Sequence, residues 1–287
     1  VLKIAIVFFV VIVGFFYVKA SNFTPFIPPS QPASTVEGSS AVTGVMTQPL
    51  WQFANGMTPS VYGVPGILSG AALVFFAFIG FDVVATASEE TKNPHKNVPL
   101  GIGVGMLLII VMYMLVAVVT TGMVSYADLA KQDSPSLATA FELVGADWAA
   151  KIISFGIVLG LATVVMVLLL GLTRIVFAMS RDGLLPRGLS KTGKHGTPAA
   201  LQIVVGAVVA LVAAFFDIGV LSDMVNIGTL SAFTLVAISI PIMRKKRPDL
   251  PRAFKMPGSP WIPILIAVAN FWLMLNLSVL TWIRFVV

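Results

Sequence analysis

GVPGILSGAALVFFAFIGFDVVATASEE, residues 63–90, is an apolar stretch long enough to cross a lipid bilayer, and Gly80 and Asp82 interrupt it. A spanning helix satisfies its backbone polar groups internally, so a glycine beside an acid at this depth is tolerated where the backbone or the acid faces a cavity. We therefore predict that the helix over this stretch is discontinuous near Phe78 to Gly80, with its freed backbone groups facing a cavity. Secondary transporters bind their substrates at helix breaks of this kind.

The composition of the whole chain is that of a membrane protein. Hydrophobic residues make up 57% and charged residues 10% of the 287 residues, whereas soluble domains carry about 25% charged residues. Seven apolar segments are each long enough to form a spanning helix. These segments are residues 3–18, 63–88, 101–122, 148–179, 200–217, 220–243 and 261–285. The predicted fold class is all-α and integral to the membrane, with about seven spanning helices.

Basic residues are concentrated in the loops that follow the second, fourth and sixth apolar segments. These loops and the adjoining helix ends hold 13 of the 18 Lys and Arg residues. Because cytoplasmic loops are enriched in Lys and Arg, residues 180–199 and 244–258 are predicted to be cytoplasmic. Residues 20–62, rich in Pro, Ser, Thr and Gly, are predicted to form an irregular extracellular loop. The net charge of +6 then follows from topology, and a nucleic acid partner is not indicated.

Cysteine labelling tests this orientation directly, because the chain contains no cysteine. A cysteine introduced at Ser39 is expected to react with an impermeant reagent added outside intact cells, whereas one introduced at Lys194 is expected to stay unlabelled until the cells are opened. The reverse pattern would overturn the predicted orientation.

Several motifs together resemble those of one transporter family. They are FFAFIGFD at 75–82, SEETKNP at 88–94, VPLGI at 98–102, RIVFAMSRDGLLP at 174–186 and FWLMLNLSVLTWIRF at 271–285. This combination, which covers nearly the whole chain, resembles amino acid permeases of the amino acid, polyamine and organocation superfamily, in particular the cationic amino acid transporter branch and its bacterial relatives. The resemblance implies that residues 1–287 are a partial transporter domain of the LeuT-type inverted-repeat fold, holding family helices five to eleven. The chain is then expected to be a fragment that lacks the first four helices and the C-terminal end.

The resemblance also implies where an amino acid substrate binds. In this family the first and sixth helices unwind to form the site, so the chain would carry about half of it. Phe76, Ala77 and Ile79 match sixth-helix positions that line the pocket, and Gly80 permits close approach of the backbone. Ordinary packing against lipid or helices is the alternative for the phenylalanines. The sequence leaves open whether the substrate is cationic or neutral.

A proton-coupling role for Lys3 is likewise implied by the resemblance. Proton-coupled relatives place a fifth-helix lysine where sodium-coupled members hold an ion, and desolvation favours the neutral form of a buried amine. Thr163 is then a candidate hydroxyl partner, and Met166, three residues further on, shares its helix face and is a candidate substrate contact. The alternatives are a Lys3 side chain that extends to the membrane interface and a threonine that bonds its own helix turn.

Three acidic residues after the break are candidate gating groups: Asp82, Glu89 and Glu90. Structural pairing for Asp82, and ion pairing with the basic inner surface for Glu89 and Glu90, are the alternatives. Asp217, Asp223 and Asn226 are predicted to be solvated at an outer turn. No metal or cofactor is expected, because the two histidines are isolated and cysteine is absent.

Glycine spacing predicts two helix-packing sites, at Gly101, Gly103 and Gly105 and at Gly156 and Gly160. A nucleotide-binding loop is excluded for the first group, because no strand precedes it and the spacing is wrong. Small residues at these intervals allow helices to approach each other closely.

Secondary active transport of amino acids is the function that these features favour. We expect it to be proton-coupled, to proceed by alternating access around the discontinuous helix, and to take place in the plasma membrane. A polyamine or organocation exchanger and a truncated, inactive fragment are alternatives. An ion channel is disfavoured because no filter or ring of polar residues is visible. An intramembrane enzyme is disfavoured because the spans contain no histidine and no catalytic arrangement.

Overall fold

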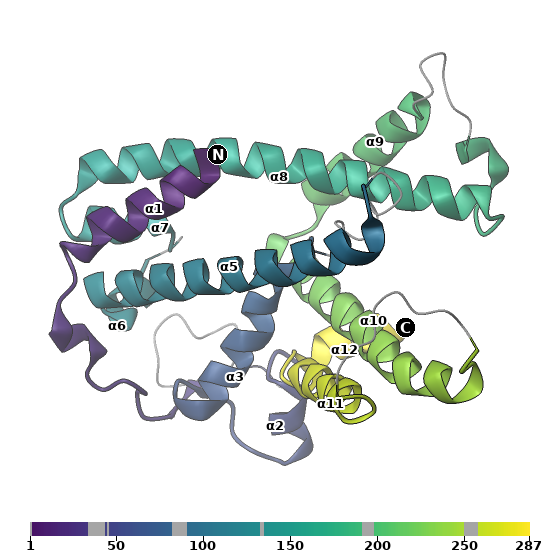
Figure 1. Ribbon diagram of the computed structural model, residues 1–287. Helices are drawn as coiled ribbons and strands as arrows, with labels where there is room; N and C mark the ends of the chain where they lie inside the picture. Colours follow the sequence, from purple (N-terminus) through teal and green to yellow (C-terminus); the bar gives the residue numbers. More distant parts are fainter. Residues whose placement is uncertain are drawn as a thin grey trace. The chain divides into compact units, whose positions relative to one another are not determined.

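The computed structural model describes residues 2–33, 44, 46–81, 91–132, 135–190, 198–249 and 258–287. These residues form two compact units, each with its own core (Figure 1). Unit 1 consists of Val1–Thr24 and Gly80–Phe215, and unit 2 consists of Pro25–Ile79 and Phe216–Val287. The chain therefore passes from unit 2 into unit 1 between Ile79 and Gly80.

Every predicted apolar segment is mostly helical over its described residues. The three long helices are α5 (Pro94–Met123), α8 (Asp147–Arg181) and α10 (Ile218–Lys246). The shorter apolar helices are α1 (Leu2–Phe15), α3 (Gly63–Val74), α9 (Ala199–Phe215) and α11 (Trp261–Leu275). The prediction of an all-α membrane fold is confirmed at this level.

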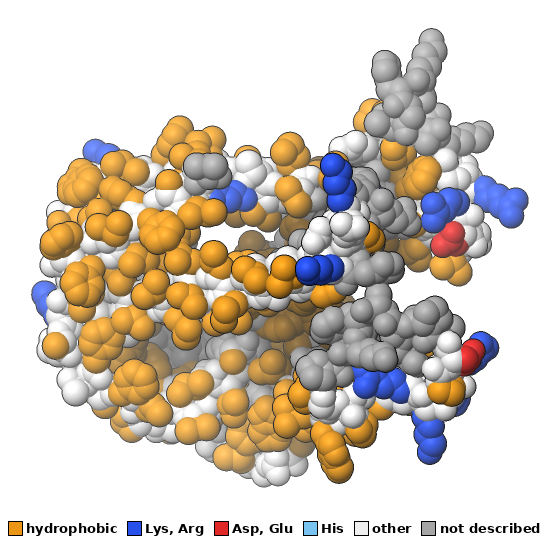
Figure 2. Space-filling view, viewed as in Figure 1, with side chains coloured by type: hydrophobic (Ala, Val, Ile, Leu, Met, Phe, Trp, Pro, Cys, Tyr) orange, Lys and Arg blue, Asp and Glu red, His pale blue; other side chains and the backbone are white. Residues whose placement is uncertain are grey.

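The long helices are apolar but largely unburied within the described structure. In the most apolar 18-residue windows of α5 and α8, only 6% and 11% of the residues are buried. Hydrophobic side chains cover much of the face shown in Figure 2, and Lys and Arg side chains are far fewer on it. Exposed apolar surface on this scale requires lipid or further protein to cover it.

Unit 1 is built around close packing of α1 against α5 and α8. Its core contains Val10, Val119, Phe141 and Ile153, which are at most 4% exposed. The short helices α6 (Tyr126–Ala130) and α7 (Leu137–Leu143) follow α5, and α7 packs on α8. The 3₁₀ turn η6 (Arg187–Ser190) follows the end of α8.

Only one of the two predicted glycine packing sites is found in the described structure. A Cβ at Gly156 would overlap the side chain of Ile6 on α1, so this glycine is required for the close α1–α8 contact. A Cβ at Gly160 would meet no atom within 4 Å. For Gly101, Gly103 and Gly105 likewise, no described atom lies within 4 Å of a Cβ, and their packing stays a prediction.

Replacing Gly156 with leucine is therefore expected to destabilise unit 1, by about 1–3 kcal/mol, because the new side chain forces α1 away from α8. Gly160→Leu is the matched control on the next helix turn and should have little effect. Thermal unfolding of both variants in detergent gives the comparison. Equal losses of stability would show that the α1–α8 contact is not the cause.

Unit 2 is built around α10 and α11, with α3 packed against both. Its core consists of Ala72, Ile227, Leu230, Met274 and Leu277. The last turn of α10 carries Arg244, Lys245 and Lys246. Positive charge there complements the negative end of the helix dipole.

The predicted irregular loop, residues 20–62, contains short regular elements. They are η1 (Ala20–Phe23) in unit 1 and, in unit 2, α2 (Leu50–Ala54) and an antiparallel pair formed by β1 (Gln31–Pro32) and β2 (Ser60–Val61). The prediction of an irregular loop is wrong for these residues. Residues 34–43, which include the labelling position Ser39, lie outside the described part of the chain.

The predicted span over residues 261–285 is not one helix. It divides into α11 and α12 (Val279–Val286), and Ser278 caps α12 by accepting a hydrogen bond from the Thr281 amide at 3.2 Å. Residues 46–50, which lead into α2, form hydrogen bonds with the backbone groups that this break leaves without helical partners. The Leu50 amide donates to the Leu277 carbonyl at 3.0 Å, and the Val279 amide donates to the Gln48 carbonyl at 3.1 Å. Pairing with this loop makes a break in an apolar segment tolerable.

Candidate functional site

The break predicted in the first quoted stretch is present. The α-helix α3 ends at Val74 and tightens into the 3₁₀ turn η4 (Phe75–Phe78). Ile79 is then extended, with φ −63° and ψ 138°, and Gly80 has φ +113°. The helix thus ends where the break is predicted, and residues 82–90, over which it would resume, lie outside the described residues. Whether the break faces a cavity stays a prediction.

Gly80 is required by its backbone conformation rather than by crowding. A φ of +113° lies in a region that residues with a Cβ rarely adopt. A Cβ at this position would lie 3.8 Å from Leu168 Cδ2 of α8, an ordinary van der Waals distance. The local chain direction at the break therefore depends on glycine's conformational freedom.

The two adjacent phenylalanines of η4 have different environments. Phe75 packs into the core of unit 2 and makes an edge-to-face contact with Phe233 of α10, at a centroid distance of 6.1 Å. Phe76 is 43% exposed, and the neighbouring Ala77 is exposed as well. Ile79 and Gly80 are partly buried. Core packing thus accounts for Phe75, whereas Phe76 and Ala77 are open to a ligand or to further protein.

Lys3 lies on the first turn of α1 and is exposed in the described structure. Helix α1 runs antiparallel to α8, since Phe9 contacts Trp148 at a ring-centroid distance of 5.8 Å, and Ile6, one turn nearer the N-terminus, lies against Gly156. Figure 1 shows the start of α1 beside α8.

The register of this pair places Lys3 and Thr163 on the same side of the Ile6–Gly156 contact. Lys3 is three residues before Ile6, about 4.5 Å along α1, and Thr163 is seven residues after Gly156, about 10.5 Å along α8. Both residues thus lie beyond the same end of the Ile6–Gly156 contact, and pairing of Lys3 with Thr163 stays a prediction.

The Thr163 hydroxyl itself donates to the Gly160 carbonyl of its own helix at 2.8 Å. This is the alternative that we considered for a threonine inside a span. Met166 lies on the same helix, is 64% exposed, and comes two residues before Leu168, the residue nearest to Gly80. Unit 1 thus holds Lys3, Thr163, Met166 and Gly80, and unit 2 holds Phe76, Ala77 and Ile79.

The candidate gating residues Asp82, Glu89 and Glu90 lie outside the described residues, as does the second labelling position, Lys194. Their roles stay predictions. Of the motif at 75–82, the structure describes residues 75–81.

Sequence analysis missed Asn226. It was expected to be solvated, but it is 0% exposed in the core of unit 2. Its Nδ2 donates to the Leu73 carbonyl of α3 at 3.4 Å, one residue before α3 ends. Nearby, Asp223 is only partly exposed and accepts a hydrogen bond from the Thr281 hydroxyl at 2.9 Å. The mostly apolar sequence that follows Asn226 on α10 could have indicated that this residue is buried.

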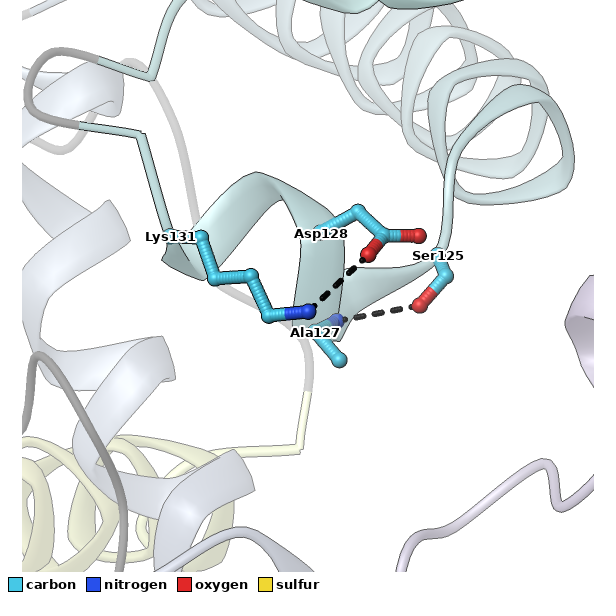
Figure 3. Close-up of polar contacts among 4 residues, drawn as sticks. All are labelled: Ser125, Ala127, Asp128 and Lys131. Carbon is cyan, nitrogen blue, oxygen red and sulfur yellow. Dashed lines mark hydrogen bonds and ion pairs between the residues drawn. The ribbon is translucent and has the colours of Figure 1, made fainter.

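A surface hollow of about 270 Å³ in unit 1 is not the predicted site. It includes none of the candidate residues, and it is lined by Thr120 and Thr121 of α5, by Tyr126, Leu129 and Ala130 of α6, and by Val124 and Pro135. Figure 3 shows the adjoining α6, whose N-cap Ser125 accepts from the Ala127 amide at 3.2 Å. The Lys131–Asp128 ion pair beside it, at 3.4 Å, is well exposed and contributes little stability.

Comparisons with known proteins agree with a membrane protein whose helices are largely apolar. The family model described as amino acid permease matches residues 1–285. The branched-chain amino acid permease BcaP of Bacillus subtilis (strain 168) is 41% identical over 288 residues, which is 100% of this chain and 55% of the relative. The methylthioribose transporter of the same organism is 39% identical over 287 residues, again 100% of this chain and 55% of the relative.

A plant relative matches a smaller part of the chain. Cationic amino acid transporter 3, mitochondrial, of Arabidopsis thaliana is 46% identical over 184 residues, 64% of this chain and 30% of the relative. The chain thus spans about half the length, 55%, of the two bacterial relatives that it matches throughout. The relatives are named as transporters or permeases. The chain therefore belongs to the amino acid permease family, within the amino acid, polyamine and organocation superfamily, and is an integral, multi-pass membrane protein.

Proposed function

We propose that the protein carries neutral, branched-chain amino acids across the plasma membrane by proton-coupled alternating access, with the helix break at residues 75–80 as part of its substrate site. The observation that carries this proposal is the break itself: a 3₁₀ turn, an extended Ile79 and a left-handed Gly80 in an apolar segment of a permease. The C-terminal end of α3 and η4 presents the negative end of a helix dipole, which favours a substrate ammonium group.

The apolar character of the break supports a neutral side chain rather than a cationic one. The candidate contacts Phe76, Ala77 and Ile79 are apolar, and the described residues 46–81 include no Asp or Glu. A lysine side chain bound at these contacts would have no carboxylate among the described residues 46–81 to pair with, and burying an unpaired charge is costly. Burial of a leucine side chain instead stabilises by about 1.5–3 kcal/mol. The 41% identity to BcaP over the whole chain supports the same choice.

Methylthioribose import is the second candidate, because the transporter of that name is 39% identical over the whole chain. The two candidates differ in the polar groups that the site must satisfy. A sugar presents several hydroxyls that need hydrogen-bond partners, whereas the side chain of leucine needs only an apolar pocket.

Solute competition in proteoliposomes tests the proposal. Protein expressed from its complete coding sequence should accumulate labelled leucine under an inward proton gradient. Excess isoleucine and valine should compete strongly, whereas lysine and methylthioribose should compete weakly. Accumulation of methylthioribose without leucine uptake would favour the second candidate, and strong competition by lysine would move the substrate class to cationic amino acids.

A further inference from the structure

We infer that Asn226 is a positioning residue for the helix break: its amide donor holds the Leu73 carbonyl and so fixes where α3 changes into η4. The inference rests on the proposed function, because it assigns Asn226 a role in substrate affinity. Asn226 itself lies in the core and is not proposed to touch the substrate.

The contact joins two elements that are far apart in the sequence. Asn226 on α10 and Leu73 on α3 are separated by 153 positions, and Asn226 Nδ2 lies 3.4 Å from the Leu73 carbonyl oxygen. Ala72, adjacent to Leu73, and Ile227, adjacent to Asn226, are both 0% exposed in the same core cluster. The amide is therefore held in a packed environment, where a hydrogen bond is electrostatically stronger than in water.

The Leu73 carbonyl lies where the helix type changes. In a 3₁₀ turn the amide of each residue bonds the carbonyl three residues earlier rather than four, so the backbone hydrogen-bond partners change at this junction. The Phe75 amide contacts the Leu73 carbonyl but also bonds the carbonyl of Ala71, four residues earlier. The side chain of Asn226 supplies a further donor at this junction.

Stability alone does not favour asparagine at this position. Asn226 is fully buried, and its Oδ1 has no hydrogen-bond partner among the described residues. A buried polar atom without a partner is destabilising, and an apolar side chain of similar size would avoid that penalty. The donor to Leu73 is the interaction that an apolar residue would lose.

The orientation of Phe76 and Ala77 is what this interaction controls. Each residue added to an α-helix rotates the chain by about 100°, and a 3₁₀ turn by about 120°, so moving the junction by one residue turns the following side chains. Helix α10 is itself fixed one turn earlier, where Asp223 accepts the hydrogen bond from Thr281 of α12.

Asn276 offers a matched control in the same unit. It is 4% exposed, its Oδ1 also lacks a partner among the described residues, and its Nδ2 donates to a backbone carbonyl at 2.8 Å. That carbonyl belongs to Trp272 on its own helix, four residues earlier. Asn276→Leu therefore removes a comparable buried amide without releasing α3.

The first measurement compares leucine uptake kinetics and thermal unfolding of wild type, Asn226→Leu, Asn226→Gln and Asn276→Leu, each expressed from the complete coding sequence. Asn226→Leu should raise the KM for leucine about three- to tenfold, as expected for loss of one buried hydrogen bond. Asn276→Leu should leave KM unchanged. Asn226→Gln should recover part of the affinity, because its longer side chain keeps an amide donor within reach of the Leu73 carbonyl. Unchanged KM in Asn226→Leu, or Gln no better than Leu, would overturn the inference.

Hydrogen–deuterium exchange provides a readout that does not depend on transport. Amides from Phe75 to Gly80 should exchange faster in Asn226→Leu than in wild type, and should be unaffected in Asn276→Leu. Equal exchange in both variants would overturn the positioning role even if leucine is not the substrate. Conversely, absence of leucine uptake by wild type, together with faster exchange in Asn226→Leu, would overturn the proposed substrate and leave the positioning of the break supported.

Discussion

Lys3→Ala is expected to retain leucine binding but to lose gradient-driven accumulation of leucine. The expectation rests on the proposed proton coupling, in which Lys3 links transport of the substrate to the proton gradient. The antiparallel register of α1 and α8 places Lys3 and Thr163 beyond the same end of the Ile6–Gly156 contact within unit 1. The measurement is initial leucine uptake into proteoliposomes at a series of external pH values.

Two further variants make this result specific. Lys3→Arg should behave like Lys3→Ala, because a guanidinium does not release its proton in the accessible range. Lys151→Ala is the control, since Lys151 is an exposed lysine on α8 that is not a candidate coupling residue, and it should retain the full pH dependence. If all variants accumulate leucine as wild type does, Lys3 only extends to the membrane interface.

Gly80→Ala is expected to lower leucine uptake about five- to one hundredfold. A residue with a Cβ held in a sparsely populated backbone region is destabilised by about 1–3 kcal/mol, and relaxation of that strain would change the path of the chain through the break. The space around Gly80 does not prevent the substitution, since a Cβ there would lie 3.8 Å from Leu168. The measurement is leucine uptake per folded transporter, normalised to protein recovered by size-exclusion chromatography.

Gly70→Ala is the matched control for Gly80→Ala. Gly70 lies within α3, and no described atom is within 4 Å of a Cβ at that position. Alanine is favoured over glycine inside a helix by about 1 kcal/mol, so Gly70→Ala should leave uptake unchanged and stability equal or higher. Equal uptake by both variants would show that the left-handed conformation at residue 80 is not needed for transport.

Features that depend on local sequence alone could be predicted. The seven apolar segments follow from hydropathy, because each spanning helix satisfies its backbone in isolation from the rest of the chain. The break near Phe78 to Gly80 follows from a glycine placed next to an acid in an apolar stretch. Both predictions needed only residues adjacent in the sequence: the apolar segments are mostly helical, three described helices are long and apolar enough to span a membrane, and α3 and η4 end at the predicted break.

Features that depend on distant partners could not be predicted. The break between α11 and α12 is stabilised by backbone pairing with residues 46–50, more than 200 positions earlier. Asn226 looked like a solvated residue near a helix start because its partner, the Leu73 carbonyl, lies on α3. Nothing in the local sequence shows which buried amide has such a partner.

Glycine spacing was an incomplete guide for the same reason. Gly156 is packed because Ile6 of α1 lies against it, whereas Gly160, one turn away on α8, meets no described atom within 4 Å. A spacing of four residues identifies a face that permits close packing. Which glycine on that face is used depends on the register of the neighbouring helix.

Substrate protection at the break tests the central claim most directly. Single cysteines are placed at Ala77, in the predicted site, and at Ala71, an exposed residue on the preceding turns of α3, in protein that is otherwise free of cysteine. Maleimide labelling is then followed with and without leucine. The account predicts that saturating leucine slows labelling at residue 77 at least about tenfold and leaves residue 71 unaffected, with lysine giving little protection. Labelling at residue 77 that leucine does not slow, in protein that still binds leucine, would contradict the placement of the substrate at this helix break.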